Sequence, residues 1–249
     1  MKIAKAAAYW LFIICLPLLL LTSTIHFGVS NRHIYEYGFN KYEISQVTGL
    51  NETQLSQVAK RLVNYFNSKA ATPQIEVINK YGEEIRFHDY ELIHLQDVKG
   101  LFQLNHRVQA ASLAYVIIYV LLPSLTVILR ERSNRRISLR TGFLLWKKGH
   151  WQVLVKGISR GCALTLIFIA ILGIASVFGF EQLFIRFHYL AFTNPYWMLD
   201  PSKDYLIMLF PEGFWQDIAM FGGISIALEA LLFGGIAWIV PRIHQRHSC

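Results

Sequence analysis

The sequence predicts a membrane all-α bundle of four transmembrane helices with a small α+β extracytoplasmic cap. Hydrophobic residues make up 54% of the 249 residues and charged residues only 16%, whereas soluble domains carry about 25% charged residues. The apolar residues gather in runs of roughly 20, the length needed to cross about 30 Å of hydrocarbon. A disordered chain and an ordinary cytosolic enzyme are both excluded by these runs.

The four apolar runs are the predicted transmembrane helices: 1–27, 108–130, 157–179 and 217–240. The first run resembles a signal peptide, because Lys2 and Lys5 precede its apolar core. No small-x-small cleavage site follows that core, so we interpret the run as an uncleaved helix.

The distribution of basic residues predicts the orientation in the membrane. Residues 130–156 contain eight lysines and arginines and one acidic residue, so 131–156 is interpreted as a basic cytoplasmic loop. Both termini, with the tail 241–249, are expected on the same side, whereas the cap 28–107 and the segment 180–216 face outward. The net charge of +8 then belongs to a rim that meets anionic lipid headgroups, and no nucleic-acid partner is expected.

The first outward segment contains patterns of a small α+β cap. Apolar residues at helical spacing predict an amphipathic helix over 51–67. Two short runs rich in isoleucine and valine, 74–78 and 84–87, flank a turn with a glycine and predict a β-hairpin. Asp89 is expected to be the N-cap of a further helix that runs toward the second span.

The second outward segment, 180–216, is rich in aromatic residues. Twelve of the 38 residues from Phe178 to Trp215 are aromatic, where the chain average of 14% gives about five. An interfacial belt alone would explain this density. Polar groups among the rings favour a re-entrant or surface-lying element over a plain loop. Asn194 and the proline after it predict a helix end, and Asp200 and the proline after it predict a helix N-cap.

Histidines with neighbouring carboxylates are the candidates for chemistry, because no nucleophile elbow, zinc helix, Walker loop or dinucleotide fingerprint is present. Tyr90, His94 and Asp97 fall on one helix face, where a carboxylate can accept the imidazole N–H and orient the ring. His188 has phenylalanines four residues away on either side. A lone histidine is, however, more often structural than catalytic.

The sequence supports metal or thiol chemistry less well than histidine-based chemistry. His94 and His188 with Asp97 and Asp200 could bind a metal, but their spacing is not diagnostic, and we predict no metal and no cofactor. None of the three cysteines lies in an outward segment, which disfavours a cysteine-based acyl-enzyme on that side.

Four stretches resemble the bacterial lipoprotein intramolecular transacylase (Lit) family: ELIHLQDVK at 91–99, FEQLFIRFHYLAFTN at 180–194, WMLDP at 197–201 and LIMLFPEGF at 206–214. The chain is also similar to this family in its four spans and large first outward loop. The long basic loop 131–156 departs from the family pattern.

The resemblance implies an acyltransferase of the bacterial cell membrane with its site at the outer face. The reaction would move the sn-2 acyl chain of a diacylglyceryl-modified lipoprotein onto the α-amine of its N-terminal cysteine. His94 and His188 correspond to the family's catalytic pair, enclosed by aromatic residues. We expect a monomer whose partners are the lipoprotein substrate and membrane lipids.

The chemistry of such a transfer fits the residues. Ester to amide is downhill, so no ATP is needed, and an amine of pKa about 7.7–8.0 needs only an ordinary base. We assign His94 as principal base, oriented by Asp97 or Tyr90, and His188 as acid partner, although the two roles could exchange. The oxyanion donor is expected to be Asn194, Trp197 or a backbone N–H. The candidates for supporting the pair or binding substrate are polar and aromatic residues: Tyr90, Asp97, Phe192, Asn194, Trp197 and Asp200.

Other functions stay open at this stage. The same histidines could activate water in a lipid or lipoprotein acyl hydrolase, or serve a metal-dependent membrane enzyme. A non-enzymatic accessory protein is the remaining alternative. Transport is disfavoured, because four spans with a single buried ionisable residue, Glu229, make a poor polar pathway.

Overall fold

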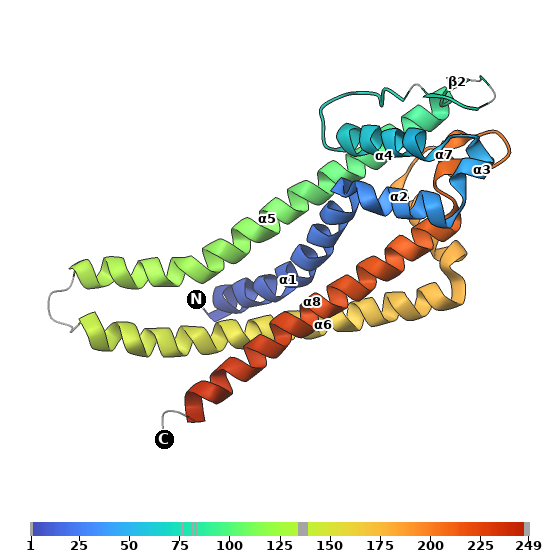
Figure 1. Cartoon of the computed structure of the whole chain (residues 1–249). Helices are drawn as coiled ribbons and strands as arrows, with labels where there is room; N and C mark the ends of the chain where they lie inside the picture. The colour runs from blue at the N-terminus through green and yellow to red at the C-terminus, as the bar shows by residue number, and fades with distance from the viewer. Residues whose placement is uncertain (1, 76, 81, 83, 134–138, 247–249) are drawn as a thin grey trace. The chain divides into compact units, whose positions relative to one another are not determined.

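The described residues are mostly helical and include a two-stranded sheet between α4 and α5 (Figure 1). The computed structural model describes the backbone of residues 2–75, 77–80, 82, 84–133 and 139–246. It describes their side chains except at 123–149, 241 and 243–246. The elements are α1 (Lys2–Ser30), α2 (Arg32–Lys41), α3 (Ile44–Thr48), α4 (Glu52–Phe66), β1 (Val77–Ile78), β2 (Glu84–Ile85), α5 (Asp89–Ser133), α6 (Leu139–Ala191), α7 (Tyr205–Leu209) and α8 (Glu212–Arg246).

Within the described residues, three helical stretches are long and apolar enough to cross a membrane: Lys2–Ser30, His150–Ala191 and Glu212–Val240. The predicted span 108–130 belongs to α5, and its residues 123–130 fall outside the residues whose side chains are described. The predicted basic loop 131–156 and the tail 241–249 also lie largely outside them.

The chain divides into two units, which we call the span unit (Met1–Ser23, Arg107–Ile171 and Ile224–Cys249) and the cap unit (Thr24–His106 and Leu172–Gly223). Close helix packing organises the span unit. A Cβ on Gly157 of α6 would lie 2.7 Å from the ring of Phe12, and one on Gly161 would lie 2.5 Å from Leu16. Two glycines four residues apart therefore let α1 approach α6 closely.

The core of the cap unit forms around the amphipathic helix α4. Asn51 accepts a hydrogen bond from the backbone N–H of Gln54, whose side chain returns one to Asn51, so a capping box begins the helix. The buried face of α4 joins the core through Leu55, Val58, Ala59, Leu62, Tyr65 and Phe66. The predicted helix over 51–67 is confirmed.

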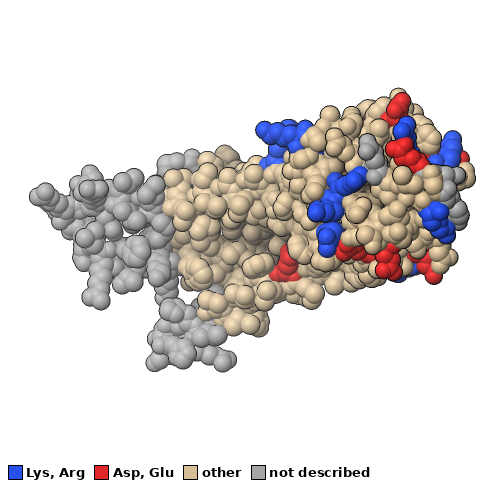
Figure 2. Space-filling model, turned by 45° about the horizontal axis from the view of Figure 1, so that its top comes forward, with Lys and Arg blue, Asp and Glu red and all other residues tan. Residues whose placement is uncertain are grey.

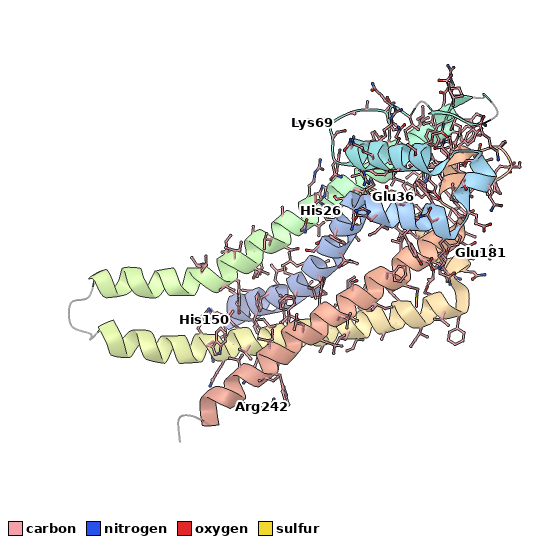
Figure 3. All side chains as sticks on the ribbon, viewed as in Figure 1. His26, Glu36, Lys69, His150, Glu181 and Arg242 are labelled. Carbon is pink, nitrogen blue, oxygen red and sulfur yellow. The ribbon has the colours of Figure 1, made fainter. Side chains whose placement is uncertain are left out.

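Two short helices before α4 were not predicted. Helix α2 begins after the N-cap Asn31 and packs against α4, and α3 packs against α2 and α7. Glu36 of α2 (labelled in Figure 3) accepts a hydrogen bond of 2.7 Å from Ser56 of α4. Figure 2 shows lysines and arginines interspersed with acidic residues on the surface. The cap unit also contains the Lys41–Asp217 ion pair at 2.5 Å.

The predicted hairpin is confirmed, with shorter strands than expected. β1 and β2 pair antiparallel, with Val77 opposite Ile85. Gly82 in the turn has φ of +81°, a left-handed conformation that glycine adopts without steric cost.

The prediction that Asp89 is the N-cap of α5 is wrong. Asp89 is the first helical residue, and the capping carboxylate is that of Glu91, which accepts the backbone N–H of His88 at 2.7 Å. Glu91 stands three residues after His88, the spacing at which a side chain reaches back to the N-cap backbone.

The aromatic-rich segment begins with a kink and ends in irregular structure. Helix α6 kinks at Gly179 and ends at Ala191, just before Asn194 as predicted. The prediction that Asp200 caps a helix is wrong, because its carboxylate accepts hydrogen bonds from the N–H and hydroxyl of Ser202 at 2.9 and 2.7 Å and closes a turn. Helix α7 begins only after Asp204.

Candidate active site

Two histidines from distant parts of the sequence meet in the cap unit. His94 lies in the second turn of α5 and His188 in the last turn of α6, and each is only 7% exposed. Their ring centroids are 6.0 Å apart, with the planes inclined by 35°. The sequence-based pairing of His94 with His188 is therefore present in the fold.

Aromatic rings enclose the two imidazoles. Phe184 lies 4.2 Å and Trp197 5.0 Å from the ring of His188, measured between centroids. Phe192 contacts both histidines, at 5.0 Å from His94 and 5.5 Å from His188. The enclosure is apolar, and such surroundings disfavour charged forms of the groups inside.

The hydrogen bond of His188 fixes its tautomer. Its Nδ1 lies 2.7 Å from the backbone oxygen of Phe184. A carbonyl oxygen only accepts hydrogen bonds, so Nδ1 carries the proton and the lone pair of the neutral ring is on Nε2.

His94, by contrast, has a buried nitrogen without a partner. Its Nδ1 makes no hydrogen bond to any part of the chain that the structure describes. Burial, and to a smaller extent the nearby His188, lower the pKa of His94 to about 4, although the carboxylate of Asp97 opposes the shift. At neutral pH the ring is therefore uncharged.

The predicted orientation of His94 by Asp97 or Tyr90 is wrong. Asp97 accepts a hydrogen bond of 2.8 Å from the side-chain amide of Asn194, and the Tyr90 hydroxyl donates to Asp204. That bond, together with desolvation and the neighbouring carboxylates, raises the pKa of Tyr90 to about 12. Asp97 acts on His94 through its charge alone, because its carboxylate is directed to the segment after α6.

The other predicted residues differ in their distance from the pair. Phe192 and Trp197 touch the histidine rings, whereas Asn194 is half-buried and reaches α5 through Asp97. Asp200 is exposed, and its side chain bonds only to Ser202 within the described residues.

Three residues form a second cluster in the cap unit, which was not predicted from the sequence and which we call the carboxylate joint: His88, Glu91 and Asp204. Nδ1 of His88 lies 3.0 Å from Glu91 and 3.3 Å from Asp204. The ligating atoms lie within 4.8 Å of one another and could hold a cation. The capping-box spacing of His88 and Glu91 was the available signal, whereas nothing in the sequence linked Asp204 to them.

Comparisons with known proteins bear on the family and the fold of the chain. No curated protein matches the chain. Solved structures of the membrane integral lipoprotein intramolecular transacylase Lit from Bacillus cereus do match it. One is 18% identical with a TM-score of 0.72 and covers 100% of both chains. Another, with a histidine-to-alanine mutation, is 17% identical with a TM-score of 0.71 and covers 98% of this chain and 97% of its own.

At these identities the solved structures establish a likeness of fold. The family model described as "Lipoprotein intramolecular transacylase Lit" matches residues 10–215, more than half of the chain. Three membrane-competent helices and the membrane-integral relatives identify a membrane protein. The chain belongs to the lipoprotein intramolecular transacylase Lit family.

Proposed function

We propose that this acyltransferase moves the sn-2 acyl chain of a diacylglyceryl-modified lipoprotein onto the α-amine of the N-terminal cysteine. The amine nitrogen bonds to the ester carbonyl carbon, and the bond from that carbon to the glyceryl oxygen breaks. One proton leaves the nitrogen and one reaches the alkoxide, so the reaction gives the lyso-form lipoprotein without water or a cofactor. The observation that carries this function is the buried His94–His188 pair inside aromatic rings.

His188 is the proposed carrier of that proton. Its Nε2 lone pair takes the proton from the attacking amine, and the Phe184 carbonyl stabilises the resulting imidazolium through Nδ1–H. The alkoxide is far more basic than the amine and takes the same proton as it leaves. A single imidazole thus balances the reaction, and no acyl-enzyme forms.

His94 has a different proposed role from the principal base assigned on sequence alone. A pKa of about 4 makes it a weak base, and at neutral pH it has no imidazolium proton to donate. A neutral imidazole still has one N–H, which can donate a hydrogen bond to the tetrahedral oxyanion. We therefore propose that the two roles exchange, with His188 as base and His94 as oxyanion donor.

The aromatic enclosure supports a positioning role. Amine and ester belong to one substrate, so holding the headgroup in a cyclic near-attack geometry supplies much of the rate. Phe192 and Trp197 contact the imidazoles at 5.0 to 5.5 Å and limit the conformations available to the substrate between them.

We further propose a monomer with four spans, the fourth being residues 108–130 of α5, among membrane lipids. The termini would be cytoplasmic and the histidine pair would face the outer leaflet, as the basic residues of 131–156 predict. We also propose the limits that the sequence predicts for the spans, the cap, the basic loop and the tail.

Mass spectrometry of a lipoprotein's N-terminal lipopeptide tests the function, in a host that lacks N-acylating enzymes. Transfer leaves the total mass unchanged and moves one chain to nitrogen in the fragment spectrum. Loss of an acyl chain would identify a hydrolase instead. No change with verified, membrane-inserted protein would favour an accessory protein.

Glutamine variants test the assignment of roles. His94→Gln keeps an N–H donor, so we expect at least about tenfold more transfer than in His94→Ala. His188→Gln has no basic nitrogen and should be as inactive as His188→Ala. The opposite pattern would return the base role to His94.

A further inference from the structure

The segment between α6 and α8 is attached to helix α5 on both sides of His94. On one side Asn194 donates to Asp97, three residues after His94. On the other side Tyr90 and Glu91, at the start of α5, bind residues 204–206. This segment includes Phe192 and Trp197, whose rings contact the histidine pair.

Glu91 caps two helices with one carboxylate. It is 0% exposed, and one oxygen accepts the N–H of His88 at 2.7 Å at the start of α5. The other oxygen accepts the N–H of Leu206 at 2.7 Å in the first turn of α7. The N-cap residue of α7, Asp204, makes no capping bond of its own, so Glu91 supplies that cap from α5.

Asp204 is bound as completely as Glu91. It is 1% exposed, and one oxygen accepts the N–H of Asp200 at 2.7 Å, while the other accepts the Tyr90 hydroxyl. His88 lies against both carboxylates and supplies a donor. Every oxygen of the two carboxylates thus has a protein partner, which favours a structural joint over a cation site. A protein interior tolerates a buried carboxylate when hydrogen-bond donors satisfy its oxygens in this way.

We propose that Glu91 and Asp204 are positioning residues for the acyl transfer. The carboxylate joint holds the start of α7 against α5, and the Asp97–Asn194 bond holds the other end of the segment. Trp197, between these attachments, is thereby fixed against His188. This inference rests on the proposed function, since the fixed ring is the wall against which the lipoprotein headgroup is folded.

The first test compares Glu91→Gln with Glu84→Gln, a matched control in an exposed ion pair with Arg86. A glutamine cannot accept from His88 and Leu206 as a carboxylate does, so Trp197 should lose its fixed position. We expect kcat to fall by about 10- to 100-fold, with KM for the lipopeptide within about threefold of wild type. The control should keep wild-type kcat and KM.

Fluorescence quenching of Trp197 by acrylamide gives a readout independent of activity. Its contribution is the difference between each variant and the same variant carrying Trp197→Phe. We expect the quenching constant of Trp197 to rise at least twofold in Glu91→Gln and not in Glu84→Gln. Wild-type kcat with unchanged quenching in Glu91→Gln would overturn the proposal.

Tyr90→Phe keeps the proposal testable if Glu91→Gln does not fold. It removes one donor to Asp204, and we expect a smaller change in the same direction, with kcat lowered and Trp197 more accessible. Unchanged kcat and quenching in a folded Tyr90→Phe protein would count against the joint. Absence of transfer in the wild-type protein would refute the proposed function, while the quenching comparison would still test the joint.

Discussion

Glu91 and His94 lie three residues apart on α5 and are both buried polar side chains, but their hydrogen bonding is opposite. Both oxygens of Glu91 accept from protein donors, whereas Nδ1 of His94 has no partner in the described chain. A satisfied buried carboxylate holds neighbouring elements together, and an unsatisfied buried nitrogen costs stability. One turn of α5 thus supplies structural support at Glu91 and keeps a nitrogen available at His94.

We expect the largest loss of transfer rate from changes to the histidine pair, whose two members should behave as one unit. His94→Ala and His188→Ala should each lower the transfer rate by about 10²- to 10⁴-fold. Because the base His188 and the oxyanion donor His94 act on the same tetrahedral transition state, the double variant should be little worse than the poorer single variant. Lipopeptide mass spectrometry over a time course measures all three, and multiplicative losses would show that the histidines act independently.

Removing the carboxylate of Glu91 should lower the stability of the protein. Glu91→Leu leaves the N–H groups of His88 and Leu206 without their acceptor, so we expect the free energy of unfolding to fall by about 3–5 kcal/mol. Thermal unfolding in detergent micelles measures the change, with Glu84→Leu as the exposed control. A loss below about 1 kcal/mol would contradict the assignment of Glu91 as a supporting residue.

The pH dependence of stability isolates His94. Its pKa is about 4 in the folded protein and near 6.5 when unfolded. The unfolded chain therefore binds more protons between these values, so stability contributed by the neutral ring is complete above about pH 7 and is lost as the pH falls toward 4. The loss should reach roughly 3 kcal/mol. Unfolding curves of wild type and His94→Gln should diverge across this window, and parallel curves would contradict the shift.

The smallest expected effect is on the stability of a His94 variant at neutral pH. His94→Leu removes a nitrogen that has no partner among the described residues, so the free energy of unfolding should change by no more than about 1 kcal/mol or increase. Transfer should nevertheless be lost. Destabilisation as large as that of Glu91→Leu would mean that His94 also supports the fold, and would remove the distinction between the two residues.

Local features of the cap were predictable because their signals are contiguous in the sequence. The amphipathic pattern of α4, the turn glycine at Gly82 and the helix end before Asn194 each depend on neighbouring residues. Helices α2 and α3 were missed because they are short and acquire their stability from packing. Asp200 was misread because its carboxylate was free to close a turn with Ser202 instead of capping a helix.

The membrane class was predictable from the length of the apolar runs, and the two histidines were predictable from the motifs around them. The groups that those histidines face become evident only in the folded chain. Asp97 could orient His94 by spacing alone, yet Asn194 offers its amide to that carboxylate across 97 residues of sequence. Likewise His88 acquires its two carboxylates only when Asp204 is brought to α5. Hydrogen-bond partners follow from distance in space, which local periodicity does not encode.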